Sequence, residues 1–170
     1  AYVATDNLAA GRMGGKHLMQ LVGDGAKTIL FRHMEGQQST DQRETGALEE
    51  MKAAGANVLI DNRYTGRDMN ESQRAALNMI DTIRQADGIF ASNQTASEGL
   101  VIALQKNGLA GTLKVVGFDN SPILEQALAK GEIEGWFLAG RIVGDMGTIF
   151  INRQNRRDIP RAGSLILKAI

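Results

Sequence analysis

Polar side chains with complementary hydrogen-bonding groups follow the short apolar runs of this 170-residue chain, directly or in the loop beyond. The candidates are Arg43, Tyr64, Arg67, Asn93 and Asp119. A carboxylate, an amide and a guanidinium together supply donors and acceptors in fixed geometry. In an open parallel sheet, ligands bind beyond the carboxyl ends of the strands. The sequence therefore predicts a site for a hydroxyl-rich ligand at that edge.

Two of these residues have a simpler alternative role. Asn and Asp are common N-caps, so Asn93 and Asp119 could serve only to cap the helices that follow them. Either residue alone leaves both readings open. Their joint occurrence at strand ends, together with Arg43, favours the ligand site.

Other chemistries fit the sequence poorly. The run Gly11-Arg-Met-Gly-Gly-Lys16 is one residue short of a phosphate-binding GxxxxGK loop, and His17 stands where Ser or Thr would bind magnesium. We interpret its glycines as close helix packing. His33-Met-Glu35 lacks the PCxxC partner of zinc deaminases, so we expect no metal site and no cofactor. Without a GxSxG elbow or an acid–base pair, we expect no enzyme.

Composition narrows the class of protein further. The 19 Lys and Arg residues balance 19 Asp and Glu residues, which argues against a general nucleic-acid binder. Cysteine is absent, so thiolate catalysis and disulfides are excluded. No run of about 18 uncharged apolar residues exists to span a membrane. The first residues lack the features of a signal peptide, and we expect an exported protein to have lost one.

Short apolar runs alternate with amphipathic stretches along the chain, which is typical of βαβ units. We expect strands at Tyr2–Thr5, Thr28–Arg32, Asn57–Ile60, Gly88–Ser92, Lys114–Phe118, Ile133–Ala139 and Ser164–Lys168. We expect helices at 9–22, 40–54, 68–85 and 95–107, with another beginning at Ser121-Pro122. The predicted fold is α/β, a three-layer, doubly wound, mostly parallel sheet.

The motifs at these strand ends resemble a known family. They are Thr5-Asp6-Asn7, Arg43-x-x-Gly46, Ile89-Phe-Ala-Ser-Asn93 and Val115-Val-Gly-Phe-Asp119. Together they resemble the periplasmic sugar-binding proteins of ABC transporters, in the ribose-binding-like branch of the type I periplasmic binding fold. The resemblance implies two Rossmann-like lobes that close around a sugar by a hinge motion.

The resemblance also implies roles for individual residues. Arg43, Asn93 and Asp119 match sugar-hydroxyl contacts of the second lobe, and Phe118 matches a position that lines the pocket. Arg67 stands where the family usually has a stacking aromatic residue, with Tyr64 nearby. Since Arg pairs well with carboxylates and phosphates, this departure suggests an anionic or unusual sugar. The family's hinge glutamine is missing near residues 139–141.

The same resemblance divides the chain. Residues 1–5 are expected to be a hinge-strand remnant, 6–139 the C-terminal ligand-binding lobe, and 164–170 a final hinge-region strand. Residues 140–163 are expected to form a helix that packs on the absent N-terminal lobe. Uncovered, its apolar face would drive association, so we expect a dimer or an exchanged helix in this fragment.

The function implied is that of the sugar-binding component of an ABC importer. Its partners would be a sugar and a membrane permease, with no direct nucleic-acid contact, and its location periplasmic or extracytoplasmic. The alternative is the effector-binding core of a lactose-repressor-type transcriptional regulator, which shares the fold. Two segments that flank the Gly-Phe-Asp motif resemble those of the binding proteins rather than those of the regulators. They are Gly111-Thr-Leu-Lys114 and Gly131-Glu-Ile-Glu134.

Overall fold

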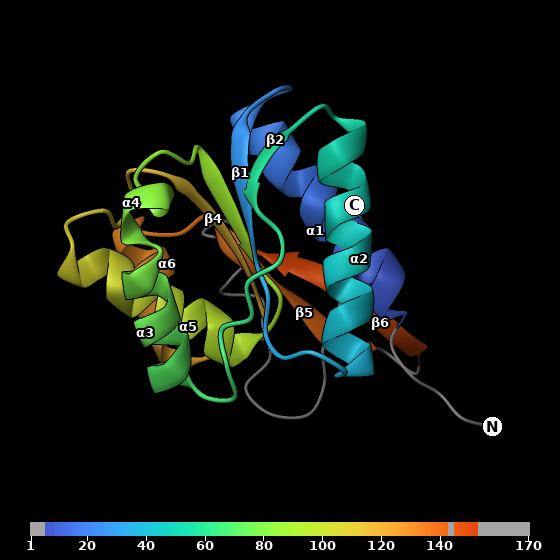
Figure 1. The fold of residues 1–170 in the computed structure, drawn as a ribbon. Coiled ribbons are helices and arrows are strands. Elements are labelled where there is room, and N and C mark those ends of the chain that lie inside the picture. Colours follow the sequence, from blue (N-terminus) through green and yellow to red (C-terminus); the bar gives the residue numbers. More distant parts are fainter. Residues whose placement is uncertain (1–5, 143–144, 153–170) are drawn as a thin grey trace.

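The computed structural model describes residues 6–142 and 145–152, which form one six-stranded sheet between two layers of helices (Figure 1). The strands are β1 (Lys27–Phe31), β2 (Asn57–Ile60), β3 (Gly88–Ala91), β4 (Lys114–Phe118), β5 (Gly135–Ile142) and β6 (Asp145–Ile151). Their order across the sheet is β2-β1-β3-β4-β5-β6. The first five strands pair in parallel, and β6 runs antiparallel to β5. The predicted α/β fold is confirmed.

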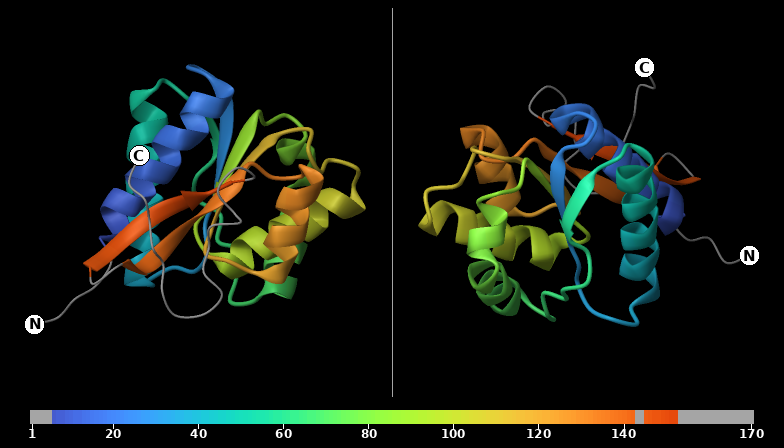
Figure 2. Two further views of the ribbon diagram at one scale, coloured as in Figure 1. Left: turned by 180° about the vertical axis from the view of Figure 1, so that it is seen from behind. Right: turned by 45° about the horizontal axis from the view of Figure 1, so that its top comes forward.

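Helices cover both faces of the sheet (Figure 2). One layer holds α1 (Asn7–Val22) and α2 (Gln38–Ala53), and the other holds α3 (Met69–Asn78), α4 (Ile80–Ile83), α5 (Gln94–Lys106) and α6 (Pro122–Lys130). Successive residues of β1 serve opposite layers, since Leu30 packs with α1 and α2 while Ile29 and Phe31 pack with the other helices. A strand buried on both faces reads as a continuous apolar run. Among the described helices, none combines the length and apolarity needed to cross a membrane.

Polar residues fix the starts of four helices. The side chain of each N-cap accepts a hydrogen bond from a backbone N–H three residues further on, which satisfies one of the helix's unpaired donors. These N-caps are Asp6, Asp68, Asn93 and Ser121. One predicted helix differs from expectation, because the stretch 68–85 is interrupted at Met79 and forms α3 and α4.

The helix predicted over residues 140–163 is wrong in its described part. Residues 145–151 form β6, paired with β5 from Trp136↔Ile151 to Ile142↔Asp145. Glycine at 140, 144 and 147 disfavours a helix interior, and the β-branched and aromatic run Thr148–Ile151 favours a strand. Pairing with β6 also satisfies the backbone groups of β5, which would otherwise be an open sheet edge.

The dimer expectation depended on that helix, so this part of the structure no longer supports it. The hinge strands expected at residues 1–5 and 164–170 lie outside the described residues, as do residues 153–163.

Glycines bring α1 and α2 into close contact, as predicted for the run that begins at Gly11. A Cβ on Gly11 would meet the backbone of Arg43, one on Gly15 the backbone of Ala47, and one on Gly46 the backbone oxygen of Leu8. Such positions allow two helix backbones to approach more closely than any larger residue would permit. The contact holds α2 at a fixed height over the sheet.

We expect Gly46→Ala to destabilise the protein by about 1–3 kcal/mol, because the new methyl group would overlap the α1 backbone. In a free helix the same change would stabilise by about 1 kcal/mol, so the sign of the effect is diagnostic. Urea denaturation measures it. Thr45→Ala, at an exposed position on the same helix, is the control and should change stability by less than about 0.5 kcal/mol. Equal stability of Gly46→Ala and wild type would contradict the close contact.

Candidate functional site

Arg43 lies at the centre of the carboxyl edge of the sheet. Its Nε donates to Asn7 Oδ1 (2.9 Å), and its Nη1 donates to Ser92 O and to Asp119 Oδ2 (both 3.2 Å). Its guanidinium carbon lies 3.8 Å from the centroid of the Phe118 ring, in a cation–π contact. The structure therefore brings together α1, α2 and the ends of β3 and β4 around one side chain. The predicted residues Arg43, Asp119 and Phe118 are in contact.

The Arg43–Asp119 ion pair is partly open to solvent. The Arg43 side chain is 11% exposed and that of Asp119 is 32% exposed. Burial raises the pKa of the Asp119 carboxyl above its ordinary value, and the Arg43 guanidinium opposes that rise. Burial likewise lowers the pKa of Arg43, opposed by Asp119. Each charge thus offsets part of the free-energy cost of burying the other.

Asn93 does act as a helix cap, as the alternative reading held. Its Oδ1 accepts from the backbone N–H of Ala96 (3.0 Å) at the start of α5. Its amide nitrogen has no hydrogen-bond partner among residues 6–142 and 145–152, so it keeps donors for other use. Asp119 is no cap, because Ser121 caps α6. Phe118 is fully buried beneath Arg43 and supports the guanidinium rather than facing an open pocket.

Tyr64 and Arg67 lie apart from this cluster. The Tyr64 ring packs against the guanidinium of Arg32, with 4.7 Å between the Arg32 guanidinium carbon and the ring centroid. Arg67 is exposed, and its backbone N–H donates to Glu71 Oε2 (2.7 Å). Within the described part of the chain, no hydrogen bond, ion pair or ring contact joins either residue to Arg43, Asn93 or Asp119.

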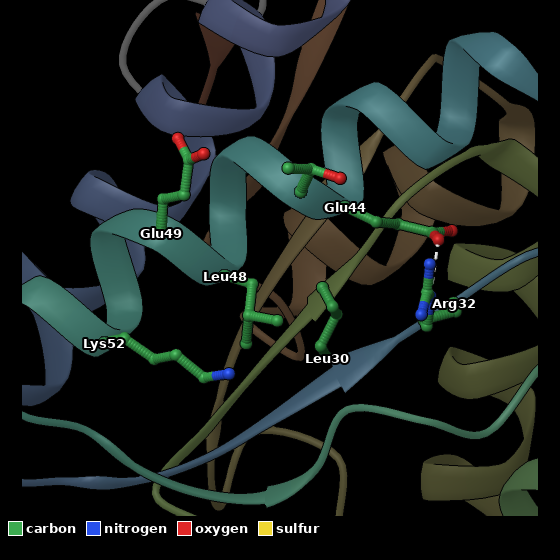
Figure 3. Close-up of a pocket in the computed structure, with 7 residues that line it drawn as sticks. Leu30, Arg32, Glu44, Leu48, Glu49 and Lys52 are labelled. Atoms are coloured by element: carbon green, nitrogen blue, oxygen red, sulfur yellow. Dashed lines mark hydrogen bonds and ion pairs between the residues drawn. The ribbon is translucent and has the colours of Figure 1, made fainter.

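A second ion pair lies beside the first. Glu44 follows Arg43 on α2 and is fully buried. Its carboxylate accepts from Arg32 Nε (2.7 Å), from the His33 backbone N–H (2.8 Å) and from Ser92 Oγ (2.7 Å). A pocket of about 230 Å³ between α2 and β1 borders this pair (Figure 3), and of the two side chains only that of Arg32 is partly exposed. The pocket is lined by Leu30, Arg32, Glu44, Thr45, Leu48, Glu49 and Lys52.

A family model described as a periplasmic binding protein domain matches residues 1–149. The chain belongs to this family. The ribose import binding protein RbsB of Salmonella typhimurium is 28% identical over 133 residues, covering 78% of this chain and 44% of that protein. A solved ABC transporter solute-binding protein of Agrobacterium vitis with bound D-fucose matches with a TM-score of 0.81 at 25% identity, covering 91% of this chain and 61% of that structure.

A regulator also resembles this periplasmic binding protein domain. The ribose operon repressor of Halalkalibacterium halodurans is 28% identical over 127 residues, covering 71% of this chain and 36% of the repressor. The chain thus spans less than two thirds of each of these relatives.

The sequence interpretation of this periplasmic binding protein domain missed four residues that build the site. They are Asn7, Arg32, Glu44 and Ser92. For Glu44 a signal was present, because it lies three residues before Ala47 and seven before Met51 on the apolar face of a predicted helix. A carboxylate in an apolar helical stripe requires a buried partner. Asn7 and Ser92 stand in motifs that carry the family resemblance, and Arg32 ends a predicted strand. Their contacts with Arg43 and Glu44 join residues far apart in the sequence, so sequence reasoning assigned no role to any of the three.

His33 should make the stability of the domain fall in acid. The residue is buried, and burial lowers the pKa of its imidazole below 6.5. As the pH falls below 6.5, the unfolded chain therefore binds a proton that the folded chain does not. Above pH 6.5 the unfolding free energy is therefore unaffected by this histidine. It falls as the pH drops from 6.5 to the lowered pKa of the folded state.

We expect His33→Gln to reduce the loss of unfolding free energy between pH 7.5 and pH 5.5. The largest possible reduction is about 1.4 kcal/mol for each pH unit by which folding lowers the pKa of His33. Urea denaturation of both proteins at several pH values measures the difference. Identical pH profiles for the variant and the wild type would contradict the assignment.

Proposed function

We propose that this chain is one lobe of the sugar-binding component of an ABC importer and works in the periplasm or outside the cytoplasmic membrane. The observation that carries the proposal is the partly exposed Arg43–Asp119 pair at the carboxyl edge of the sheet. Binding without bond making or breaking is the role, so the protein is not an enzyme. A membrane permease is the proposed partner of the complete protein.

The chemistry of the pair suits a polyol. A sugar hydroxyl donates one hydrogen bond and can accept up to two. Arg43 supplies charge-assisted donors, and Asp119 supplies carboxylate acceptors within 3.2 Å of them. Neighbouring hydroxyls on one sugar can therefore contact both residues at once. The amide donors of Asn93, unpaired among residues 6–142 and 145–152, lie one residue beyond Ser92, whose carbonyl accepts from Arg43.

The relatives support the class of ligand. One is named as a ribose import binding protein, and a solved relative holds D-fucose. Both are longer than this chain, so we propose that a second lobe completes the site and that hinge closure desolvates the sugar. Alone, this lobe offers half of the contacts and should bind sugar weakly.

The charge balance of the site supports an uncharged sugar. Arg43 is paired with Asp119, and Arg32 with Glu44, so neither guanidinium needs an anionic ligand. The anionic sugar suggested by Arg67 would require that exposed side chain to turn toward the site.

A second candidate is the effector-binding core of a transcriptional regulator. The ribose operon repressor among the relatives favours it, since the same lobe then binds its sugar as a signal. The sequence of the full gene would distinguish the two candidate functions. A helix-turn-helix segment before this lobe would support the regulator, and a secretory signal would support the importer.

We expect Asp119→Asn in the full-length protein to weaken sugar affinity about 10- to 150-fold, which is the loss of one hydrogen bond to a charged group, about 1.5–3 kcal/mol. Calorimetry with the best sugar from a thermal-shift screen of ribose, D-fucose and their epimers measures it. The fold should survive, because Asn tolerates the left-handed backbone of Asp119.

Asp61→Asn is the matched control. Asp61 pairs with Lys52 on the surface at 3.5 Å, so its loss should leave affinity unchanged. An Asp119→Asn protein that binds the sugar as tightly as wild type would rule out this site.

A further inference from the structure

Glu44 is a fully buried carboxylate in the middle of the α2 face that packs on the sheet. Thr40, Ala47 and Met51 are its buried neighbours on that face. A buried charge is strongly unfavourable unless it is paired and hydrogen-bonded. Glu44 meets that condition by accepting three hydrogen bonds from residues at the ends of β1 and β3. A Leu at this position would require no hydrogen bonds. The cost of placing a charge here implies that the connections it makes matter.

One oxygen of the carboxylate leads to the Arg43 cluster. Glu44 Oε1 accepts from Ser92 Oγ (2.7 Å) and from the backbone N–H of His33 (2.8 Å). The carbonyl oxygen of Ser92 in turn accepts from Arg43 Nη1 (3.2 Å), and Asn93 is the next residue. Holding the Ser92 hydroxyl therefore fixes the peptide that orients Arg43 and presents Asn93.

The other oxygen leads to the loop after β2. Glu44 Oε2 accepts from Arg32 Nε (2.7 Å), as Figure 3 shows, and the Arg32 guanidinium packs against Tyr64. The backbone N–H of Thr65 donates to the carbonyls of Arg32 and His33 (both 3.0 Å). The loop that carries Tyr64 and Arg67 is thus held against β1 through Arg32.

We propose that Glu44 is the positioning residue of the sugar site, acting on Arg43 through Ser92 and on the Tyr64 loop through Arg32. This rests on the proposed sugar-binding function. Glu44 itself is sealed from solvent and does not touch the ligand. The competing explanation is that Glu44 only stabilises the fold, in which case affinity follows stability alone.

Two variants separate the two oxygens. Ser92→Ala removes the hydroxyl that Oε1 holds and leaves the Ser92 carbonyl and the Arg32 bond in place. Glu44→Gln keeps an acceptor oxygen for Ser92 and His33 but turns an amide N–H toward the Arg32 Nε donor. Leu104→Ala is the stability control, because Leu104 is buried in α5 within the core of the opposite helix layer.

The measurements use the full-length protein and the sugar found by the thermal-shift screen. Calorimetry gives the affinity, urea denaturation gives the stability, and limited trypsin digestion with mass spectrometry follows cleavage at the exposed Arg63 and Arg67. We expect Ser92→Ala to weaken affinity about five- to tenfold with wild-type cleavage at these two sites. We expect Glu44→Gln to accelerate that cleavage severalfold and to weaken affinity less than Ser92→Ala. Leu104→Ala should lose stability and keep wild-type affinity.

The outcomes separate this inference from the proposed function. A wild-type protein that binds none of the sugars overturns both. If the wild type binds and Ser92→Ala binds within twofold of it, the Glu44 inference alone is overturned. If affinity falls in all three variants in proportion to their loss of stability, Glu44 has only a structural role.

Discussion

The site depends on the close approach of α1 and α2, which only glycine permits. Gly11 faces the backbone of Arg43, and Gly46 faces the backbone of Leu8. This crossing brings Arg43 within hydrogen-bonding distance of Asn7 and lays the next residue, Glu44, over the ends of β1 and β3. Any larger side chain at the crossing would push α2 outward. Both arginine–carboxylate pairs would then lose their geometry, since each joins α2 to a strand end.

The two ion pairs differ in solvent exposure, and they therefore suit different roles. Glu44 is inaccessible, and both of its carboxylate oxygens accept hydrogen bonds from the protein, three in all. Asp119 is 32% exposed and accepts one bond from Arg43. A fully buried carboxylate bonded on both oxygens can hold other groups in place, but a ligand cannot reach it. A half-open carboxylate beside a guanidinium can exchange its contact with water for a contact with a hydroxyl.

The parallel sheet explains how much of this was predictable. Continuous apolar runs identified β1 to β5 to within a few residues, and strand ends of a parallel sheet meet at one edge, so Arg43 and Asp119 could be placed together. Glu44 required knowing which face of α2 is buried and what lies beneath it. A helix was expected over residues 145–151 because of the family resemblance, whereas the pairing with β5 that makes this segment a strand is a long-range contact.

The conformation of Asp119 shows how the half-open carboxylate is held. Its φ of 63° is left-handed, which costs a non-glycine residue about 1–2 kcal/mol. The preceding residue donates its N–H to Ser97 Oγ (3.2 Å), and Asp119 donates its own to the carbonyl of Phe137 (2.7 Å). These bonds fix the end of β4 from α5 and from β5. The turn directs the carboxylate at Arg43 in advance, so in the proposed sugar site the ordering of this side chain would add little to the cost of binding.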